Sequence, residues 1–248
     1  MDRPDALNTI ANTLPSAIFG PRHRGVPAAH APTRACAPGE RSGPVDMSAE
    51  PSTTGSTTWT AAILAGGQAR RLGGIDKSAL MVGTISIIER QLSLLRGLTP
   101  HILIVASDRS RIRAGDIPVV ADRIAGAGSL GGLYTALMDA PTEQVLVIGC
   151  DMPFLEAPFL TYLMERGRDV DAAVPVDERG RHPLCASYAR RITGHLHARI
   201  AAGELRVGDA LADLEVREVG SDELAPFNLD GRLLFNINTP GDYARARA

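Results

Sequence analysis

The chain has 248 residues, of which 44% are apolar and 22% charged, and its formal net charge at pH 7 is −2. These values are typical of a soluble globular protein, and the balanced charge is unlike the basic surface of a nucleic-acid-binding protein. No apolar run approaches the length of about 20 residues that spans a bilayer. We therefore expect a cytoplasmic protein that binds neither nucleic acid nor membrane.

The first 57 residues differ in composition from the rest of the chain. They contain eight of the seventeen prolines and show no helical or strand periodicity. Such a segment cannot bury enough apolar surface to offset the entropy lost on ordering, so residues 1–57 are predicted to be disordered and residues 58–248 to form one domain. Met47 lies just before the folded part, and a translation start there is a hypothesis that the intact mass would test.

From Thr58 onward, short apolar runs alternate with segments of helical period, which predicts an α/β fold with helices on both faces of a mostly parallel sheet. Strands are predicted over 61–65, 102–106, 118–121, 144–149, 171–176, 183–188, 215–219 and 233–236. Helices are predicted over 130–140, 158–167, 192–202, 207–214 and 240–247, with another ending near Gly97 and carrying Ile85, Ile88, Leu92 and Leu95 on one face. Because strands 171–176 and 183–188 have no long helix between them, the sheet should become mixed there.

The first predicted strand runs into a glycine-rich, basic loop, Gly66–Lys77. The loop has neither the spacing of a dinucleotide-binding fingerprint nor the Gly-Lys-Ser/Thr ending of a P-loop. Its glycines would still let backbone N–H groups approach phosphate oxygens, and Arg71 and Lys77 can neutralise phosphate charge. The loop therefore indicates a ligand that carries phosphate.

Two aspartates follow later strands, at the edge of an open α/β sheet where ligands collect. Asp122 follows strand 118–121, and Asp151 follows strand 144–149. A carboxylate at such a position suits Mg²⁺, which prefers one or two carboxylates together with substrate phosphates and water. Taken singly, each feature has an ordinary structural explanation, as a turn, a solvated arginine or a helix cap. Taken together, they favour phosphate chemistry.

These residues carry a resemblance to a known family. The loop from Leu64 to Lys77 resembles the signature loop of the molybdenum cofactor guanylyltransferases, within the wider nucleotidyltransferases of Rossmann-like fold. Further family motifs recur in order at Asp122, Gly128-Ser129-Leu130-Gly131-Gly132, Cys150-Asp151-Met152-Pro153, Arg181-His182-Pro183 and Asn236-Ile237-Asn238-Thr239-Pro240. The similarity covers Thr58 to Ala248, so we expect a three-layer α-β-α nucleotidyltransferase domain over 58–248.

The resemblance implies an enzyme that transfers GMP from GTP to molybdopterin, giving the guanine dinucleotide cofactor and pyrophosphate. In the family's terms, Mg²⁺ is the cofactor and Asp151 is its ligand, helped by Asn238, while Lys77 and Arg71 hold the triphosphate. His182 is equally well explained as a contact to the pterin or as a surface histidine. The substrate-binding positions that the resemblance implies are Leu64, Ala65, Gly66, Gly67, Lys77, Asp122, Asp151, His182 and Asn238.

Some features leave alternatives open. Ala106 stands where some members have a nucleotide-contacting Asn, and Ser107 or Asp108 could take over that contact. Gly66 stands where related cytidylyltransferases tend to have Ala, and the missing methyl group favours a purine as the base of the nucleotide.

The alternative functions are a nucleotidyltransferase that uses CTP or a sugar or alcohol phosphate, and a nucleotide-binding module without turnover. A monomer is expected, with cofactor-delivering and molybdoenzyme maturation proteins as further partners.

Overall fold

The computed structural model describes residues 58–66 and 80–247, which all belong to one compact unit, 53–248. The prediction of disorder for residues 1–57 lies outside the described residues. The same is true of most of the glycine-rich loop, including Gly67, Arg71 and Lys77.

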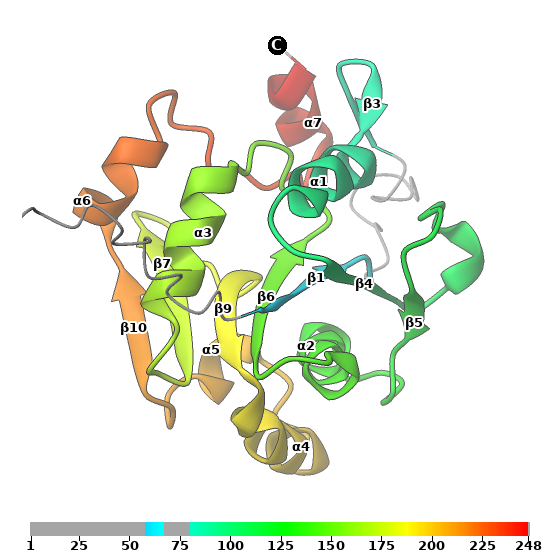
Figure 1. The fold of residues 1–248 in the computed structure, drawn as a ribbon, viewed down its shortest axis with the longest axis vertical. Helices are drawn as coiled ribbons and strands as arrows, with labels where there is room; N and C mark the ends of the chain where they lie inside the picture. The colour runs from blue at the N-terminus through cyan, green and yellow to red at the C-terminus, as the bar shows by residue number, and fades with distance from the viewer. Residues whose placement is uncertain (1–57, 67–79, 248) are drawn as a thin grey trace, which may run out of the picture. The chain divides into compact units, whose positions relative to one another are not determined.

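The centre of the domain is an eight-stranded sheet with the order β10-β7-β9-β6-β1-β4-β5, in which β8 also pairs with β7 (Figure 1). Its strands are β1 (Thr60–Leu64), β4 (His101–Ala106), β5 (Val119–Ala121), β6 (Gln144–Gly149), β7 (Ala172–Asp177), β8 (Gly180–Arg181), β9 (Cys185–Ala189) and β10 (Val216–Val219). Short strands β2 (Met81–Val82) and β3 (Ile85–Ser86) form a separate antiparallel pair.

The helices cover both faces of this sheet, which confirms the predicted three-layer α/β architecture. Helices α1 (Ile87–Arg96) and α3 (Ala157–Arg166) lie on one face, while α2 (Gly128–Asp139) and α4 (Thr193–Ala201) lie on the other (Figure 1). Each face has its own buried apolar cluster, because the strands alternate side chains between the two layers. The shorter helices are α5 (Val207–Ala210), α6 (Ser221–Leu224), α7 (Pro240–Arg247) and the 3₁₀ turns Arg109–Arg111, Arg190–Ile192 and Ala225–Phe227.

The pairing of the central strands brings their carboxyl ends to one edge. Strand β1 is parallel to both β4 and β6, with Leu64 opposite Val105 on one side and Gly149 on the other. Strand β5 continues the parallel set beyond β4. The segments that follow β6, β1, β4 and β5 are therefore neighbours at this edge, which is where ligands bind in open α/β sheets.

Strand β9 reverses the direction of the sheet, as predicted. It is antiparallel to both β6 and β7, so its amino-terminal end reaches the edge at which β6 ends. The segment that leads into β9 therefore lies at the same edge as the loops that leave the parallel strands.

Two predicted elements were wrong. Ile85 belongs to β3 and not to the following helix, because Ser86 caps α1: its hydroxyl accepts a hydrogen bond from the Glu89 N–H, and the Glu89 carboxylate accepts one from the Ser86 N–H. Residues 233–236 form no strand. Leu233 and Leu234 are buried against the core, but the Leu233 N–H donates to the Asn228 side chain, so the backbone there is satisfied by local turns.

No helix in the described ranges combines the length and apolarity that crossing a membrane requires.

Candidate active site

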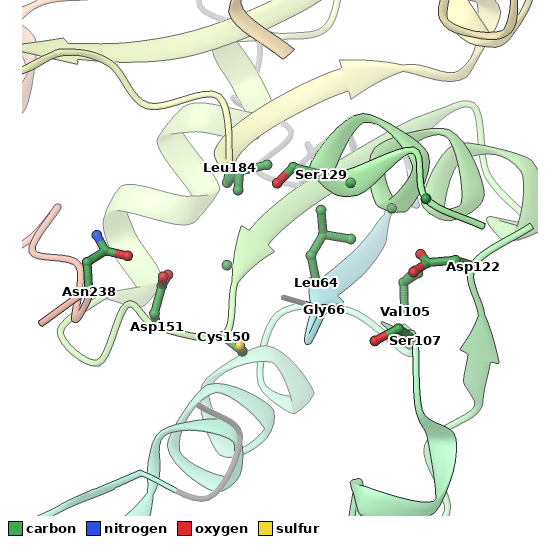
Figure 2. A pocket seen from close by; sticks show the side chains of 14 residues that line it. Leu64, Gly66, Val105, Ser107, Asp122, Ser129, Cys150, Asp151, Leu184 and Asn238 are labelled. Carbon is green, nitrogen blue, oxygen red and sulfur yellow. The ribbon is translucent and has the colours of Figure 1, made fainter. Parts of the chain in front are cut away.

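A pocket of about 720 Å³ opens at the carboxyl-terminal edge of the central strands (Figure 2). It is built from the segments after β1, β4, β5 and β6, the first turn of α2, the approach to β9 and the return of the chain before α7. The lining residues are Leu64, Gly66, Val105, Ser107, Asp122, Gly126, Gly128, Ser129, Gly132, Gly149, Cys150, Asp151, Leu184 and Asn238.

One end of the pocket carries Asp151 and Asn238 (Figure 2). The backbone around Asp151 is tied to two neighbouring segments: the Cys150 N–H donates to the Leu64 carbonyl at 3.2 Å, and the Ile237 N–H donates to the Asp151 carbonyl at 2.9 Å. The second bond brings Asn238, the next residue, to the same end of the pocket. These hydrogen bonds fix a carboxylate and an amide beside each other although they are far apart in the sequence.

The carboxylate of Asp151 lies directly over the backbone of Gly149. A β-carbon built on Gly149 would come within 2.8 Å of Asp151 Oδ1. A side chain at position 149 would therefore occupy part of the space that the carboxylate uses.

Asp151 and Asn238 suit a hard divalent cation. Both side chains offer oxygen atoms, which Mg²⁺ prefers, and this ion commonly takes only one or two protein carboxylates and fills its shell with phosphate oxygens and water. Within the described ranges, no three His, Cys, Asp or Glu side chains are grouped as a metal site. The oxygen atoms of Asp151 and Asn238 therefore fit Mg²⁺.

The opposite end of the pocket carries Asp122, which follows β5 (Figure 2). Its backbone is fixed against α2, because the Arg123 N–H donates to the Thr135 hydroxyl at 3.0 Å. The carboxylate faces two glycines, since β-carbons built on Gly66 and Gly132 would lie 4.0 Å and 3.8 Å from its oxygens. Asp122 makes no hydrogen bond to the described part of the chain, and burial raises the pKa of its carboxyl group.

The two carboxylates come from separate strand ends. Asp151 follows β6 and Asp122 follows β5, with β1 and β4 between these strands in the sheet, and the two side chains lie at opposite ends of the pocket (Figure 2).

The segment after β1 crosses the middle of the pocket between these ends. The Leu64 carbonyl already accepts from Cys150, and the Ala65 N–H donates to the Val105 carbonyl at 2.8 Å. A contact from Ala65 to a ligand must then use its carbonyl or methyl group. Gly66 is exposed, and among the described residues the nearest atom to a β-carbon built there is Asp122 Oδ2 at 4.0 Å.

The amino-terminal end of α2 forms another part of the wall. Gly126 and Gly128 adopt positive φ, of 80° and 58°, which lets the chain turn sharply into the helix beside the pocket. Within the described residues no side chain caps this helix, and Gly128 and Ser129 of its first turn line the pocket. Helix amino-terminal ends of this kind favour negatively charged or oxygen-rich groups.

His182 lies apart from the pocket-lining residues. His182 lies between β8 and β9, and its Nε2 is 2.8 Å from Oδ1 of Asp177, the last residue of β7. Leu184, two residues later, lines the pocket instead. A contact from His182 to the substrate stays a prediction, as do the roles of Gly67, Arg71 and Lys77, which lie outside the described residues.

The segment after β4 shows which of Ser107 and Asp108 is better placed to replace the nucleotide-contacting Asn that some family members have at position 106. Ala106 is buried, Ser107 lines the pocket, and Asp108 instead caps the following 3₁₀ turn by accepting from the Ser110 N–H. Ser107 is thus the better placed of the two.

A capping box holds the carboxyl-terminal helix next to Asn238. The Thr239 hydroxyl accepts from the Asp242 N–H, and the Asp242 carboxylate accepts from the Thr239 and Asn238 N–H groups. Burial alone would raise the pKa of Asp242, but the hydrogen bonds from Arg245, Asn238 and Thr239 outweigh it and lower this pKa to about 2. The charged form of Asp242 therefore stabilises the segment that carries Asn238.

Comparison with known proteins agrees with this geometry. Residues 61–215 match the MobA-like NTP transferase domain. The chain belongs to this family. A probable molybdenum cofactor guanylyltransferase of Pelotomaculum thermopropionicum is 33% identical over 76% of this chain and 91% of its own length. A molybdenum cofactor guanylyltransferase of Mesorhizobium japonicum is 34% identical over 74% of this chain and 92% of its own length.

Solved structures show the same relationship for this MobA-like domain. Molybdopterin-guanine dinucleotide biosynthesis protein A of Archaeoglobus fulgidus superposes with a TM-score of 0.67 at 28% identity, over 76% of this chain and 96% of the other. A 2-C-methyl-D-erythritol 4-phosphate cytidylyltransferase of Thermus thermophilus, at 18% identity and a TM-score of 0.57 over 77% of this chain and 97% of the other, shares the fold alone. The predicted nucleotidyltransferase family and fold are thereby confirmed.

Proposed function

We propose that this protein transfers GMP from GTP to the terminal phosphate of molybdopterin, forming the guanine dinucleotide cofactor and releasing pyrophosphate. The supporting observation is the pocket at the strand ends, with the oxygen-rich pair Asp151 and Asn238 at one end, Asp122 at the other, and Gly66 on the segment between them. Membership of the MobA-like family, together with relatives named molybdenum cofactor guanylyltransferases, supports the choice of substrates.

The reaction needs no protein nucleophile. An oxygen of the molybdopterin phosphate attacks the α-phosphorus of GTP, a new P–O bond forms, and the bond from the α-phosphorus to the bridging oxygen breaks as pyrophosphate leaves. Catalysis of this kind depends on positioning and on stabilising charge. Lys77 and Arg71 are proposed to hold the triphosphate and to offset the charge of the leaving group.

Asp151 and Asn238 are proposed to hold Mg²⁺ at their end of the pocket. When bound, the ion would polarise phosphoryl oxygens and offset charge in the transition state. Asp122, at the opposite end of the pocket, would then bind the nucleoside part of GTP, where its lone-pair oxygens can accept hydrogen bonds.

The experiment that tests this function is pyrophosphate release from each of the four nucleoside triphosphates, with and without molybdopterin and Mg²⁺. We expect release only when GTP, molybdopterin and Mg²⁺ are all present. Release with CTP but not GTP, or release that is independent of molybdopterin, would refute the proposal.

Asp151→Ala tests the role of the carboxylate. We expect kcat to fall by about a hundred-fold or more, equivalent to about 3–4 kcal/mol of transition-state stabilisation, while circular dichroism shows a retained fold. A variant that keeps near-normal kcat with Mg²⁺ would show that Asp151 does not hold the ion.

A further inference from the structure

Helix α1 carries one buried polar side chain among its apolar contacts. Its buried residues are Ile87, Ile88, Gln91, Leu92 and Leu95, and Gln91 is only 1% exposed. A glutamine on the apolar face of a helix costs free energy unless its amide is hydrogen-bonded.

The amide of Gln91 spans the loop that carries Asp151. Its Nε2 donates to the Gly149 carbonyl at 2.8 Å and to the Met152 carbonyl at 3.0 Å. These two carbonyls flank Cys150 and Asp151, so one side chain from α1 fixes both ends of this short loop. The NH₂ group of the amide has two N–H donors and can bond both carbonyls at once, whereas a hydroxyl has only one.

The other half of the same amide is left without a partner. Gln91 Oε1 is buried and accepts no hydrogen bond from the described part of the chain. An apolar side chain of similar volume would avoid that cost, but it would leave the Gly149 and Met152 carbonyls without this donor. What the amide supplies is therefore its pair of hydrogen bonds to the loop that carries Asp151.

We infer that Gln91 is a positioning residue for Asp151: its two hydrogen bonds hold the Gly149–Met152 loop so that the carboxylate keeps its place in the pocket. The inference rests on the proposed function insofar as Asp151 serves catalysis. Replacing a residue that orients a metal ligand through hydrogen bonds typically lowers metal affinity or activity by about 10–100-fold.

The chain supplies a matched control at the opposite end of the same strand. Gln144, the first residue of β6, is 8% exposed, and its Nε2 donates to the Met164 carbonyl and the Ser187 hydroxyl. It lies about 17 Å along β6 from Gly149. Gln91→Met and Gln144→Met each remove two hydrogen bonds from a buried amide, but only the first affects the loop of Asp151.

The test measures loop order and kinetics in the full chain. For Gln91→Met we expect faster hydrogen–deuterium exchange in the peptide covering residues 149–155, a kcat lowered about 10–100-fold, a raised Mg²⁺ concentration for half-maximal rate, and a KM for GTP within about three-fold of wild type. Gln144→Met should lose stability, yet keep the exchange rate of that peptide, kcat and the Mg²⁺ requirement.

The inference is overturned if the two variants show the same kcat and the same exchange in residues 149–155. Gln91→Leu is a second variant, and failure of both Gln91 variants to fold would also overturn it, because the amide would then hold the core. The exchange measurement needs no substrate, so it stands even if the wild-type protein forms no guanine dinucleotide. That separate result would refute the proposed function.

Discussion

Replacing Gly149 by alanine should move the Asp151 carboxylate without disturbing the fold. The new β-carbon would lie 2.8 Å from Asp151 Oδ1, and Asp151 must retreat by about 0.6 Å to reach the 3.4 Å at which ordinary contacts begin. The next atom, the Leu184 carbonyl oxygen, is at 3.7 Å and needs no adjustment. The displacement therefore falls on the end of one flexible side chain.

The expected effect on folding is small because two contributions oppose each other. An off-rotamer Asp151 costs about 0.5–1.5 kcal/mol, while replacing Gly by Ala lowers the entropy of the unfolded chain and stabilises by about 0.4–1 kcal/mol. The effect on catalysis is larger, since a misplacement of about 1 Å can cost a hundred-fold in rate. For about 0.6 Å we expect kcat to fall about 10–30-fold, or 1.4–2 kcal/mol.

The assay is pyrophosphate release at saturating GTP and molybdopterin over a range of Mg²⁺ concentrations, together with urea unfolding. Gly194→Ala is the matched control, because no atom lies within 4 Å of a β-carbon at this position in α4. It should keep full activity and gain up to about 1 kcal/mol of stability. Wild-type kcat and an unchanged Mg²⁺ requirement in Gly149→Ala would refute the reasoning that ties rate to the place of this carboxylate.

Three further variants test other parts of the site. Gly66→Ala should fold normally, since the nearest atom among the described residues would be 4.0 Å from the new β-carbon. It should lower kcat/KM for GTP by about 5–150-fold through crowding of the purine, and an unchanged kcat/KM for GTP would contradict this. Asp122→Asn should weaken GTP binding about ten-fold and leave the stability of the fold equal or higher. A carboxyl group whose pKa is raised in the folded state destabilises that state at pH values above this pKa. A lower Tm together with an unchanged KM for GTP would contradict this prediction. Asp242→Asn should cost about 1–2 kcal/mol at pH 7, because the pKa of this carboxyl is lowered to about 2. That difference, measured by urea unfolding, should shrink as pH falls from about 4 toward 2, and a gap that is constant with pH would argue against a charged cap.

The central strands were predictable because burial on both faces makes them continuous apolar runs. Strand β6, Gln144–Gly149, has the predicted bounds, since polar residues and a Cys-Asp-Met-Pro turn flank it. The same signal failed at 233–236. Two buried leucines there satisfy an apolar pattern, but their backbone bonds to local turns and not to a neighbouring strand. A run of apolar residues indicates that a segment is buried, but the segment forms a strand only where its backbone hydrogen-bonds to a neighbouring strand.

Pocket residues that directly follow a strand could be predicted from the sequence, because ligands bind at the carboxyl ends of strands in open α/β sheets. Contacts between segments that are far apart in the sequence could not. Asp122 and Asp151 follow from their places after β5 and β6. The amide of Gln91 contacts carbonyls 58 and 61 residues further along the chain, and no local pattern signals such a contact. A glutamine within an otherwise apolar helix face was the one available hint.

The return of the chain to the pocket after β10 has a consequence for the order of assembly. Strand β10 ends at Val219 and completes the sheet, whereas the Ile237 N–H and Asn238 join the Asp151 end only afterwards. Residues beyond 220 also supply Leu224, Leu233 and Leu234 to the buried core, so a chain that ends at residue 220 lacks part of this core as well as one wall of the pocket. Because domains generally fold as units, the core and the pocket should be completed together by the last residues to be synthesised.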